Sequence, residues 1–598
     1  MTIRDLSIES LRVAYAAGQL TPTGLIEELA TTLYDDDVHR VWIHRLPLAQ
    51  ILATAKALED RDPASLPLYG VPFAIKDNID LAGVPTTAGC PAFAHTPARS
   101  AVVVTRLVDA GAIPLGKTNL DQFATGLVGT RSPYGACRNS FDPDFISGGS
   151  SSGSAVAVAL GQASFSLGTD TAGSGRIPAA FNNLIGHKPT RGLLSATGTV
   201  PACRSLDTIS IFALTAGDAQ RVLDVAAAFD PDDPFSRVPE PGGSGFGAKF
   251  RFGVPTSDSL EFFGDEDYEA LFGATVRRLE RLGGSRVDVD LTPFLDAARL
   301  LYDGPWVAER YAAIRAFFDA HAADLHPVTR DILERSRAWS AADSYDALYR
   351  LKALRRIADR CWSDVECIVT PTAGTHYRID QVEADPVASN ANLGRYTNFM
   401  NLFDYAATAV PAGLSTLFRP FGVTLFAPAH RDVALLGLAD RLQRASVDTM
   451  GATGLPLPAA PSTLPWTAGS GLVRVAVCGA HLSGLPLNPQ LTSRNAQLVA
   501  RVKSAPCYRF YALPGSPPKR PGMVRVAEGG GAIDMEVWEL PATAFGSFVA
   551  GIPAPLGIGT VLLEDGSTVQ GFVCEAAGIE GAEDITALGG WRRYVGER

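Results

Sequence analysis

The sequence predicts a large α/β domain followed by a smaller α+β domain. Short apolar runs typical of strands alternate with helical patterns over more than 400 residues, and this alternation is typical of one large α/β domain. Near residue 450 the alternation stops, and strand-like segments predominate after it. With 598 residues, the chain is also too long for a single ordinary core.

The first domain is predicted to span residues 1–450. Its helices show apolar residues at intervals of three or four, and Thr21 and Pro22 are the residue types preferred where a helix begins. The predicted helices lie within 7–34 and over 101–110, 266–282, 295–320 and 342–361. The predicted strands are 71–75, 112–115 and 365–369.

Residues 451–470 are predicted to be a linker, because they are rich in Pro, Gly, Ala and Thr and show neither a helical nor a strand period. The remaining residues, 471–598, have the size expected for one further core. The predicted strands there are 473–478, 523–526, 532–538 and 560–563, and the predicted helices are 491–503 and 542–550.

The composition argues against several classes of protein. A net charge of −11 disfavours nucleic acid and anionic membranes as partners. The eight cysteines form no C-x-x-C pair and no zinc spacing, so we expect reduced thiols and no bound metal. The N-terminus has no apolar signal segment, and no run of about 18 apolar residues occurs. We therefore expect a cytoplasmic protein, and no cofactor motif is evident.

Two loops of small residues are the most informative motif. Residues 147–154 read Ser-Gly-Gly-Ser-Ser-Ser-Gly-Ser, and residues 168–178 begin Gly-Thr-Asp-Thr-Ala-Gly-Ser-Gly. Such turns present backbone N–H groups that suit a phosphate or an oxyanion. Apolar segments flank both loops, which disfavours a flexible linker, and neither G-x-x-x-x-G-K-[ST] nor G-x-G-x-x-G is present, which disfavours a phosphate loop. The loops therefore favour a nucleophilic serine.

A nucleophilic serine needs a base. None of the nine histidines lies in these loops, which disfavours a histidine-based triad without excluding one. Lys76 ends the apolar run 71–75. Burial lowers the pKa of a lysine towards neutrality, and a neutral lysine can serve as the base for a serine. Taken alone, a lysine in such a position is more often a surface residue.

The region 70–205 closely resembles the amidase signature family. The resemblance rests on five blocks in the family's order: Lys76-Asp-Asn, Leu115-Gly-Lys-Thr-Asn, Gly148-Gly-Ser-Ser, Gly168-Thr-Asp-Thr-Ala-Gly-Ser and Gly186-His-Lys-Pro-Thr-Arg-Gly. It implies a fold with a mixed β-sheet core covered by helices. It also implies a Ser–Ser–Lys catalytic set, in which Ser174 is the nucleophile and Ser150, on a cis peptide bond, passes the proton to Lys76.

The same resemblance implies that the backbone N–H groups of Thr171, Ala172, Gly173 and Ser174 form the oxyanion hole. Two positions depart from the family pattern, since Ala172 replaces a frequent glycine and Ser152 replaces the glycine common after the serine pair. Alanine keeps its N–H, so the oxyanion hole is expected to survive. Asp170 and Arg176 are interpreted as a structural pair, and Ser151, Ser152 and Ser154 as hydrogen-bonding loop residues.

Within the family, the chain resembles the allophanate hydrolases over nearly its full length. The similar segments are 121–135, 479–488 and 527–533. The resemblance implies allophanate as the substrate, with Tyr302 and Arg310 binding its carboxylate and Gly126 lining the same pocket. Their separation of eight residues would place Tyr302 and Arg310 on one face of a single helix. An ordinary surface arginine and a core tyrosine are the alternative.

The C-terminal domain resembles the gamma-glutamyl cyclotransferase-like fold. In the resembling family it is linked to the breakdown of N-carboxycarbamate, the first product. His481 is the only ionisable residue in loop 479–484 and is the candidate there, although a structural histidine fits equally well. A non-catalytic scaffold is a further alternative, but retention of the three catalytic residues argues against it. An amidase for another small amide, such as malonamide or biuret, also remains open.

The expected partners are small molecules and enzymes of the same pathway. The resemblance is consistent with a homodimer and with association with a urea carboxylase or a biuret-forming enzyme. It leaves open whether the pathway begins with urea or with a triazine.

Overall fold

The computed structural model describes residues 4–34, 37–239, 245–458, 472–494, 496–515 and 517–596. The chain divides into two compact units, of which one comprises Met1–Pro239 and Phe246–Ala468 and the other Glu240–Gly245 and Gly469–Arg598. Within the predicted linker, Leu455 and Leu457 pack against buried residues of the larger unit. The rest of that segment, 459–470, lies outside the described residues, so the linker stays a prediction.

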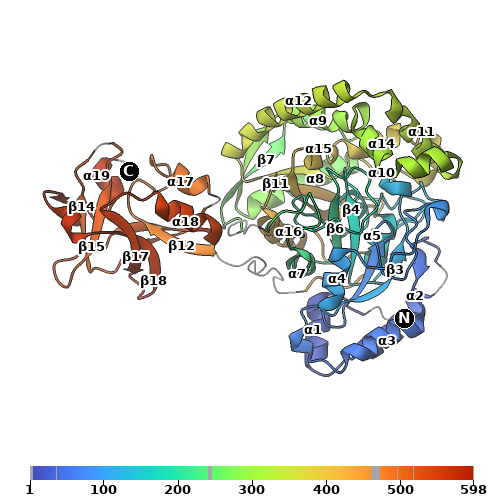
Figure 1. Cartoon of the computed structure of the whole chain (residues 1–598), viewed down its shortest axis with the longest axis horizontal. Coiled ribbons are helices and arrows are strands. Elements are labelled where there is room, and N and C mark those ends of the chain that lie inside the picture. The colour runs from blue at the N-terminus through green and yellow to red at the C-terminus, as the bar shows by residue number, and fades with distance from the viewer. Residues whose placement is uncertain are drawn as a thin grey trace. The chain divides into compact units, whose positions relative to one another are not determined.

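The larger unit is built around one mixed sheet of 11 strands in the order β1-β3-β2-β4-β6-β5-β10-β11-β9-β7-β8. β2 runs parallel to both β3 and β4, and β7 runs parallel to β8 and β9, whereas the other neighbours are antiparallel. The predicted mixed sheet covered by helices is therefore confirmed, and Figure 1 shows the sheet inside a layer of helices.

The strands and helices of this unit follow the expected order. The strands are β1 (Trp42–Arg45), β2 (Pro72–Lys76), β3 (Ile113–Thr118), β4 (Phe165–Asp170), β5 (Ile185–Lys188), β6 (Thr208–Ala213), β7 (Phe250–Pro255), β8 (Gly284–Val289), β9 (Cys367–Pro371), β10 (Tyr405–Leu414) and β11 (Pro420–Pro428). The first helices are α1 (Ile8–Ala16), α2 (Pro22–Leu33), α3 (Leu48–Leu58), α4 (Val102–Asp109), α5 (Ser152–Ala159), α6 (Ile177–Phe181), α7 (Ala216–Ala226) and α8 (Glu266–Arg281). The later helices are α9 (Thr292–Asp303), α10 (Trp306–His321), α11 (Pro327–Arg335), α12 (Ala341–Ala358), α13 (Ile379–Ala384), α14 (Ala388–Gly394), α15 (Asn398–Leu402) and α16 (Asp432–Ser446).

The central strands are covered on both faces. Every residue of β2, β4, β5 and β6 is buried. A strand without a solvent face is apolar or small at successive positions instead of alternating. Phe73 and Phe165, on the neighbouring strands β2 and β4, stack with ring centroids 5.1 Å apart. A polar side chain at the end of such a strand, such as Lys76, is therefore buried with it.

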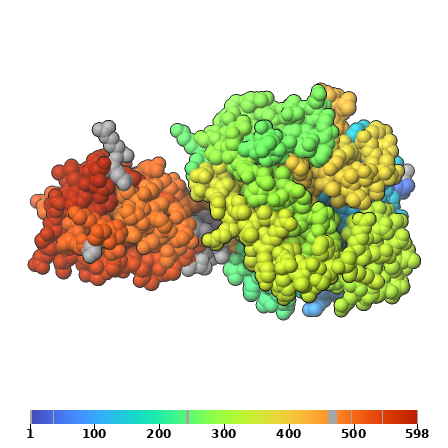
Figure 2. Space-filling model, turned by 90° about the horizontal axis from the view of Figure 1, so that it is seen from above, coloured from blue at the N-terminus to red at the C-terminus, as the bar shows by residue number. Residues whose placement is uncertain are grey.

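The helix predicted over 295–320 is wrong, because the structure has two helices there. α9 ends at Asp303 and α10 begins at Trp306. Pro305 has no backbone N–H and cannot continue the hydrogen bonding of the preceding helix. α9 packs against α10 and α12, and α10 packs against α11. These helices (yellow-green) lie together at one side of the unit in Figure 1 and cover much of the face shown in Figure 2.

The smaller unit has a five-stranded sheet, β13-β16-β12-β18-β17, and a three-stranded sheet, β15-β14-β19. Its strands are β12 (Leu472–Val477), β13 (Gln497–Lys503), β14 (Tyr508–Ala512), β15 (Pro521–Arg525), β16 (Asp534–Pro541), β17 (Leu556–Leu562), β18 (Thr568–Cys574) and β19 (Glu583–Asp584). Its helices are α17 (Pro489–Thr492), α18 (Ala542–Ala550) and α19 (Trp591–Val595).

The helix predicted over 491–503 is wrong, since most of this segment is the strand β13. β13 pairs with β16, and its residues Leu498, Ala500 and Val502 pack against the core of the unit. Tertiary pairing overrides local propensity in this segment. Of the helices in the described residues, none combines the length and the apolar character needed to cross a membrane.

Candidate active site

Lys76 lies in the interior of the larger unit. It is the last residue of β2, and its side chain has no exposure to solvent. Its Nζ donates to Ser150 Oγ at 2.8 Å and to Thr169 Oγ1 at 2.7 Å, so both partners are hydroxyls. Burial without a bonded carboxylate destabilises the ammonium form and lowers the pKa of Lys76 to about 7. Near neutral pH the amine is therefore neutral in a large share of the molecules.

Ser150 lies in the loop that precedes α5. The peptide bond between Gly149 and Ser150 is cis. The loop is held by backbone hydrogen bonds, because Ser150 O accepts from Asp121 N at 3.1 Å and Gly149 N donates to Leu127 O at 2.8 Å. These bonds fix the Ser150 hydroxyl next to the Lys76 amine.

Ser174 lies in the turn between β4 and α6, and its side chain is buried. Among the described residues, no hydrogen bond engages its hydroxyl, and the structure shows none between Ser150 and Ser174. The Ser174 oxygen is therefore uncommitted.

The turn that carries Ser174 is held by a buried ion pair. Arg176 Nε and Nη2 donate to the two carboxylate oxygens of Asp170, each at 2.9 Å. The same oxygens accept from Gly173 N at 2.8 Å and Gly175 N at 3.0 Å. The interpretation of Asp170 and Arg176 as a structural pair is confirmed.

These contacts bear on the predicted oxyanion hole. The N–H groups of Thr171, Ala172 and Ser174 have no acceptor within the described chain. Gly173 differs, since its N–H already donates to Asp170 and would have to share this bond with an oxyanion. Ala172 keeps a negative φ, so its side chain introduces no backbone strain. Three of the four predicted donors are thus free to bind an oxyanion.

The remaining serines of the first loop are hydrogen-bonded, as predicted. Ser151 Oγ donates to Thr169 O at 3.0 Å, Ser152 Oγ to Asn119 O at 3.2 Å, and Ser154 Oγ to Leu167 O at 3.0 Å. These hydroxyls join the loop to the strands beneath it.

Sequence reasoning missed Thr169 and Asn78. Asn78 Nδ2 donates to Val200 O at 3.1 Å and to Thr169 Oγ1 at 3.3 Å, so Asn78 and Lys76 meet at the same hydroxyl. A signal was present, because parallel pairing of β2 with β4 places the ends of both strands side by side. Using this signal requires the strand β4 (Phe165–Asp170), which was not among the predicted strands.

Arg310 and Tyr302 lie together, although not as predicted. Tyr302 is on α9 and Arg310 is on α10, so they do not share a helix, and the break at Pro305 is the reason. The Arg310 guanidinium stacks on the Tyr302 ring at 5.5 Å from its centroid. Arg310 is 3% exposed, and its charge contributes to the lowered pKa of Lys76, after the larger effect of burial. The two helices therefore bring this pair to the region of the serine loops.

Gly126 lies in the segment that Arg310 contacts. Arg310 Nη1 donates to Ala124 O at 3.3 Å and to Thr125 Oγ1 at 3.2 Å. A Cβ on Gly126 would lie 2.6 Å from Asp121 Oδ2, so the packing accepts only glycine there. Within the described residues, no hydrogen bond engages the N–H or the C=O of Gly126.

His481 lies in the smaller unit, where it packs as a structural residue would. Its ring stacks on Phe572 at 5.0 Å, and its Nε2 lies 3.0 Å from Gln490 Oε1. Burial lowers the pKa of His481. In the described part of the chain, no group of three or more His, Cys, Asp or Glu side chains is arranged to hold a metal ion.

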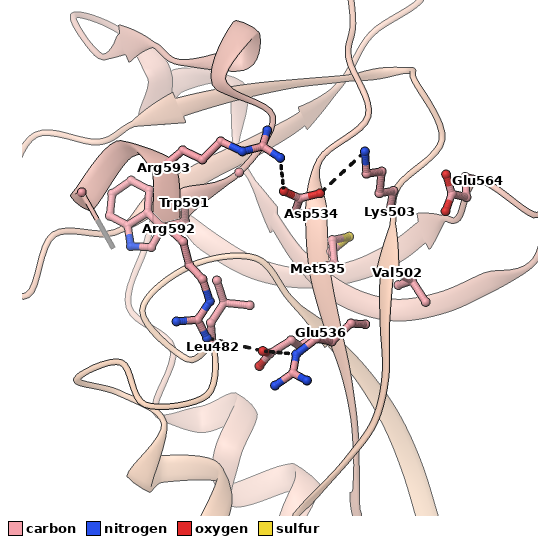
Figure 3. A pocket seen from close by; sticks show the side chains of 13 residues that line it. Leu482, Val502, Lys503, Asp534, Met535, Glu536, Glu564, Trp591, Arg592 and Arg593 are labelled. Atoms are coloured by element: carbon pink, nitrogen blue, oxygen red, sulfur yellow. Dashed lines mark hydrogen bonds and ion pairs between the residues drawn. The ribbon is translucent and has the colours of Figure 1, made fainter. Parts of the chain in front are cut away.

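A separate cavity of about 780 Å³ opens in the smaller unit, and His481 does not line it. Figure 3 shows that Asp534 and Glu536 on its wall lie next to basic side chains. Glu536 forms an ion pair with Arg501 at 3.3 Å. Asp534 forms one with Arg593 at 3.0 Å.

Known proteins resemble the chain over most of its length. Urea amidolyase from Saccharomyces cerevisiae is 42% identical over 587 residues, which cover 95% of this chain but 32% of that protein. The chain therefore spans about a third of the length of that relative. A glutamyl-tRNA(Gln) amidotransferase subunit from Chloroflexus aggregans is 33% identical over 473 residues, which cover 73% of this chain and 96% of that protein. The solved structure of Kluyveromyces lactis allophanate hydrolase is 39% identical, with a TM-score of 0.77 and 99% of both chains covered.

Two family models match separate parts of the sequence. The amidase model matches residues 37–436, and the model of the allophanate hydrolase C-terminal domain matches residues 473–596. The amidase match includes Lys76, Ser150 and Ser174. This chain therefore belongs to the amidase family, and an allophanate hydrolase C-terminal domain follows its amidase domain.

Proposed function

We propose that this chain hydrolyses allophanate (urea-1-carboxylate) to ammonia and carbon dioxide. Family membership makes it an amidohydrolase. The observation that carries the choice of substrate is the buried Arg310. In the described chain its guanidinium has no carboxylate within ion-pair distance, and its Nε has no hydrogen-bond partner. A buried, unpaired guanidinium is costly unless an anion binds it, and allophanate carries one carboxylate.

In the proposed reaction, Ser174 Oγ attacks the urea-type carbonyl carbon of allophanate. Its proton passes through Ser150 to the neutral amine of Lys76, which already contacts Ser150 Oγ at 2.8 Å. The free N–H groups of Thr171, Ala172 and Ser174 stabilise the oxyanion that forms.

The terminal C–N bond then breaks, and the proton held by Lys76 returns to the leaving nitrogen, which departs as ammonia. Water hydrolyses the ester on Ser174 and releases N-carboxycarbamate. Lys76 thus serves first as base and then as acid, and a pKa near neutrality suits both roles.

The carboxylate of allophanate is proposed to bind Arg310, with Tyr302 and Gly126 completing the site. The guanidinium is held between the Tyr302 ring and the Ala124–Thr125 segment, which fixes the direction of its remaining N–H groups. A planar guanidinium suits a carboxylate, because two parallel N–H···O bonds match its geometry. Gly126 adds a free backbone N–H beside this group.

The C-terminal domain is proposed to assist the breakdown of N-carboxycarbamate to ammonia and carbon dioxide. The family match over 473–596 supports a link between this domain and allophanate hydrolysis. The contacts of His481 with Phe572 and Gln490 favour a structural role for this histidine. The domain division is likewise proposed: residues 1–450 form the amidase domain, residues 451–470 the linker and residues 471–598 the C-terminal domain.

The protein is proposed to act in the cytoplasm as a homodimer, together with an enzyme that carboxylates urea or forms biuret. The support for a urea-linked pathway is the likeness to urea amidolyase.

The substrate assignment predicts a ranking of amides. Purified protein should release ammonia from allophanate with a higher kcat/KM than from biuret or malonamide, because both of these are neutral and leave Arg310 without a counter-ion. The measurement is ammonia release from each substrate at one pH. If malonamide or biuret were the better substrate, the allophanate assignment would be wrong and a neutral-amide hydrolase would replace it.

The Ser174→Ala variant is expected to fold and to lose all turnover. Only one small, uncommitted hydroxyl is removed, so the thermal unfolding curve should remain that of the wild type. Ser154→Ala is the matched control, since it also removes a buried hydroxyl, but one bonded to Leu167 O. That control should keep most of its activity. Turnover above a trace in Ser174→Ala would exclude Ser174 as the nucleophile.

The Lys76 base predicts a rise of activity with pH. Its pKa is lowered to about 7, so the amine is protonated and inactive below this value and neutral above it. The profile of kcat/KM against pH should therefore rise through about 7. Lys76→Ala should be nearly inactive, and Lys76→Arg should not restore activity because a guanidinium stays protonated. The exposed Lys56→Ala serves as the control, and substantial activity in Lys76→Arg would contradict the role as base.

Removal of the carboxylate site should damage allophanate turnover selectively. Arg310→Met is expected to lower kcat/KM for allophanate by about 30-fold to several thousand-fold, equivalent to about 2–5 kcal/mol. Tyr302→Phe should cost less, about 1.5–3 kcal/mol if its hydroxyl binds the carboxylate. Malonamide turnover should change little, since the serines are intact. Arg315→Met, at an exposed position on the same helix, is the control. Equal losses on both substrates would show that Arg310 supports only the fold.

A further inference from the structure

A second buried guanidinium lies beside the proposed carboxylate site. Arg131 is 2% exposed, and its Nη1 donates to Thr125 O at 2.9 Å. Its Nη2 donates to Pro386 O at 2.7 Å, so its two bonded acceptors are backbone carbonyls. Among the described residues, its guanidinium has no carboxylate within ion-pair distance, and its Nε has no partner. Arg131 is therefore a buried charge that the protein itself does not neutralise directly.

The guanidiniums of Arg310 and Arg131 both donate hydrogen bonds to the segment Ala124–Thr125. Arg310 donates to Ala124 O and to the side chain of Thr125, whereas Arg131 donates to the carbonyl of Thr125. Gly126, with its free N–H, is the next residue. Arg310 and Arg131 thus hold Ala124 and Thr125 by hydrogen bonds, and the next residue, Gly126, has the free N–H that a ligand can accept.

This segment needs such support. Phe123 and Ala124 have φ angles of +50° and +53°, in the left-handed region that non-glycine residues rarely adopt. Such a conformation costs free energy and persists only where surrounding contacts hold it. The hydrogen bonds to the carbonyls of Ala124 and Thr125 are contacts of this kind.

The nearby carboxylates do not cancel both positive charges. Asp121 uses its oxygens to accept from the backbone N–H groups of Val128 and Gly129, at 3.1 and 3.0 Å, and of Arg131, at 2.9 Å. Asp207 is occupied by the Thr171 hydroxyl and two backbone N–H groups, and burial raises its pKa. Burial also lowers the pKa of Arg131, so the charged form is held at a cost. In the described chain neither carboxylate forms an ion pair with Arg131 or Arg310, so a bound anion would be the direct counter-ion of these two guanidiniums.

We propose that Arg131 is a positioning residue that determines specificity: it holds the Thr125 carbonyl so that the Gly126 N–H and Arg310 face a carboxylate, and its charge makes the site selective for a planar monoanion over a neutral amide. The selectivity arises without contact between Arg131 and the substrate. The inference rests on the proposed function, since it concerns the same carboxylate.

The test compares an anionic and a neutral substrate. Arg131→Met should lower kcat/KM for allophanate by about tenfold or more, mainly through a higher KM, while malonamide turnover stays within about twofold. Arg131→Lys keeps the charge but cannot bridge both carbonyls in the same way, so it should restore part of the loss. Arg138→Met is the matched control, because Arg138 lies in the same part of the chain, donates to Pro143 O at 2.9 Å and is exposed.

A binding measurement keeps the test independent of catalysis. Malonate, a carboxylate probe, should bind Ser174→Ala protein about tenfold more weakly when Arg131→Met is added, and by a smaller factor, about threefold, when Arg131→Lys is added. Thermal unfolding of each variant shows whether it is folded, and Arg131→Lys decides the matter if Arg131→Met is not. An equal loss on both substrates, or no change in malonate affinity, would overturn the role of Arg131. Failure of the wild type to cleave allophanate would overturn the proposed function instead, while malonate binding would still report on the anion site.

Discussion

The burial of Lys76 at the end of a strand covered on both faces is the constraint on which the site depends. Its amine is fully buried and contacts two hydroxyls, at 2.8 and 2.7 Å. The neighbouring buried lysine, Lys117, has Asp77 as an ion-pair partner at 2.8 Å. These two lysines on adjacent strands thus have different surroundings: Lys117 faces a carboxylate, whereas the amine of Lys76 donates to hydroxyls and desolvation lowers its pKa to about 7.

A base with this property is useful only if the hydroxyls around it hold their places. Buried carboxylates hold both loops by accepting backbone N–H groups. The carboxylate of Asp121 accepts hydrogen bonds from the segment next to Ser150. The carboxylate of Asp170, paired with Arg176, accepts hydrogen bonds from the turn that carries Ser174. Hydrogen bonds to a charged acceptor are stronger than those between neutral groups, so these turns are rigid without being regular structure. Rigid donors in a buried site stabilise a developing oxyanion with little reorganisation.

Two buried guanidiniums near the serine loops are the basis of the proposed preference for an anionic amide. Arg310 and Arg131 are both buried and both keep an unpartnered Nε, and they meet at Thr125. A protein does not gain stability from two such groups, so their presence is best explained by a ligand that neutralises them. In the smaller unit Asp534 and Glu536, at the cavity of Figure 3, each form ion pairs with basic side chains, so this wall differs from the site of Arg131 and Arg310.

Local sequence was informative wherever the chemistry depends on residue type. The strand and helix patterns located β2, β3, β9, α4, α8 and α12 of the larger unit, because buried elements keep a recognisable period. The ordered blocks around Lys76, Ser150 and Ser174 identified the family that the comparisons bear out. In the smaller unit, 491–503 was misassigned because the pairing of β13 with β16, and not helix propensity, decides that segment.

The sequence by itself determined the α/β architecture, the family and the three candidate catalytic residues, since these depend on composition, period and motif order. Only the tertiary structure decided which groups meet. It joined Thr169 to Lys76 across two parallel strands, placed Tyr302 and Arg310 on separate helices at the Pro305 break, and brought Arg131 and Arg310 to one segment from positions 179 residues apart in the sequence (310 − 131). The physical reason is that burial, charge balance and unpaired hydrogen-bond donors are properties of neighbours in space, and the order of residues does not specify them.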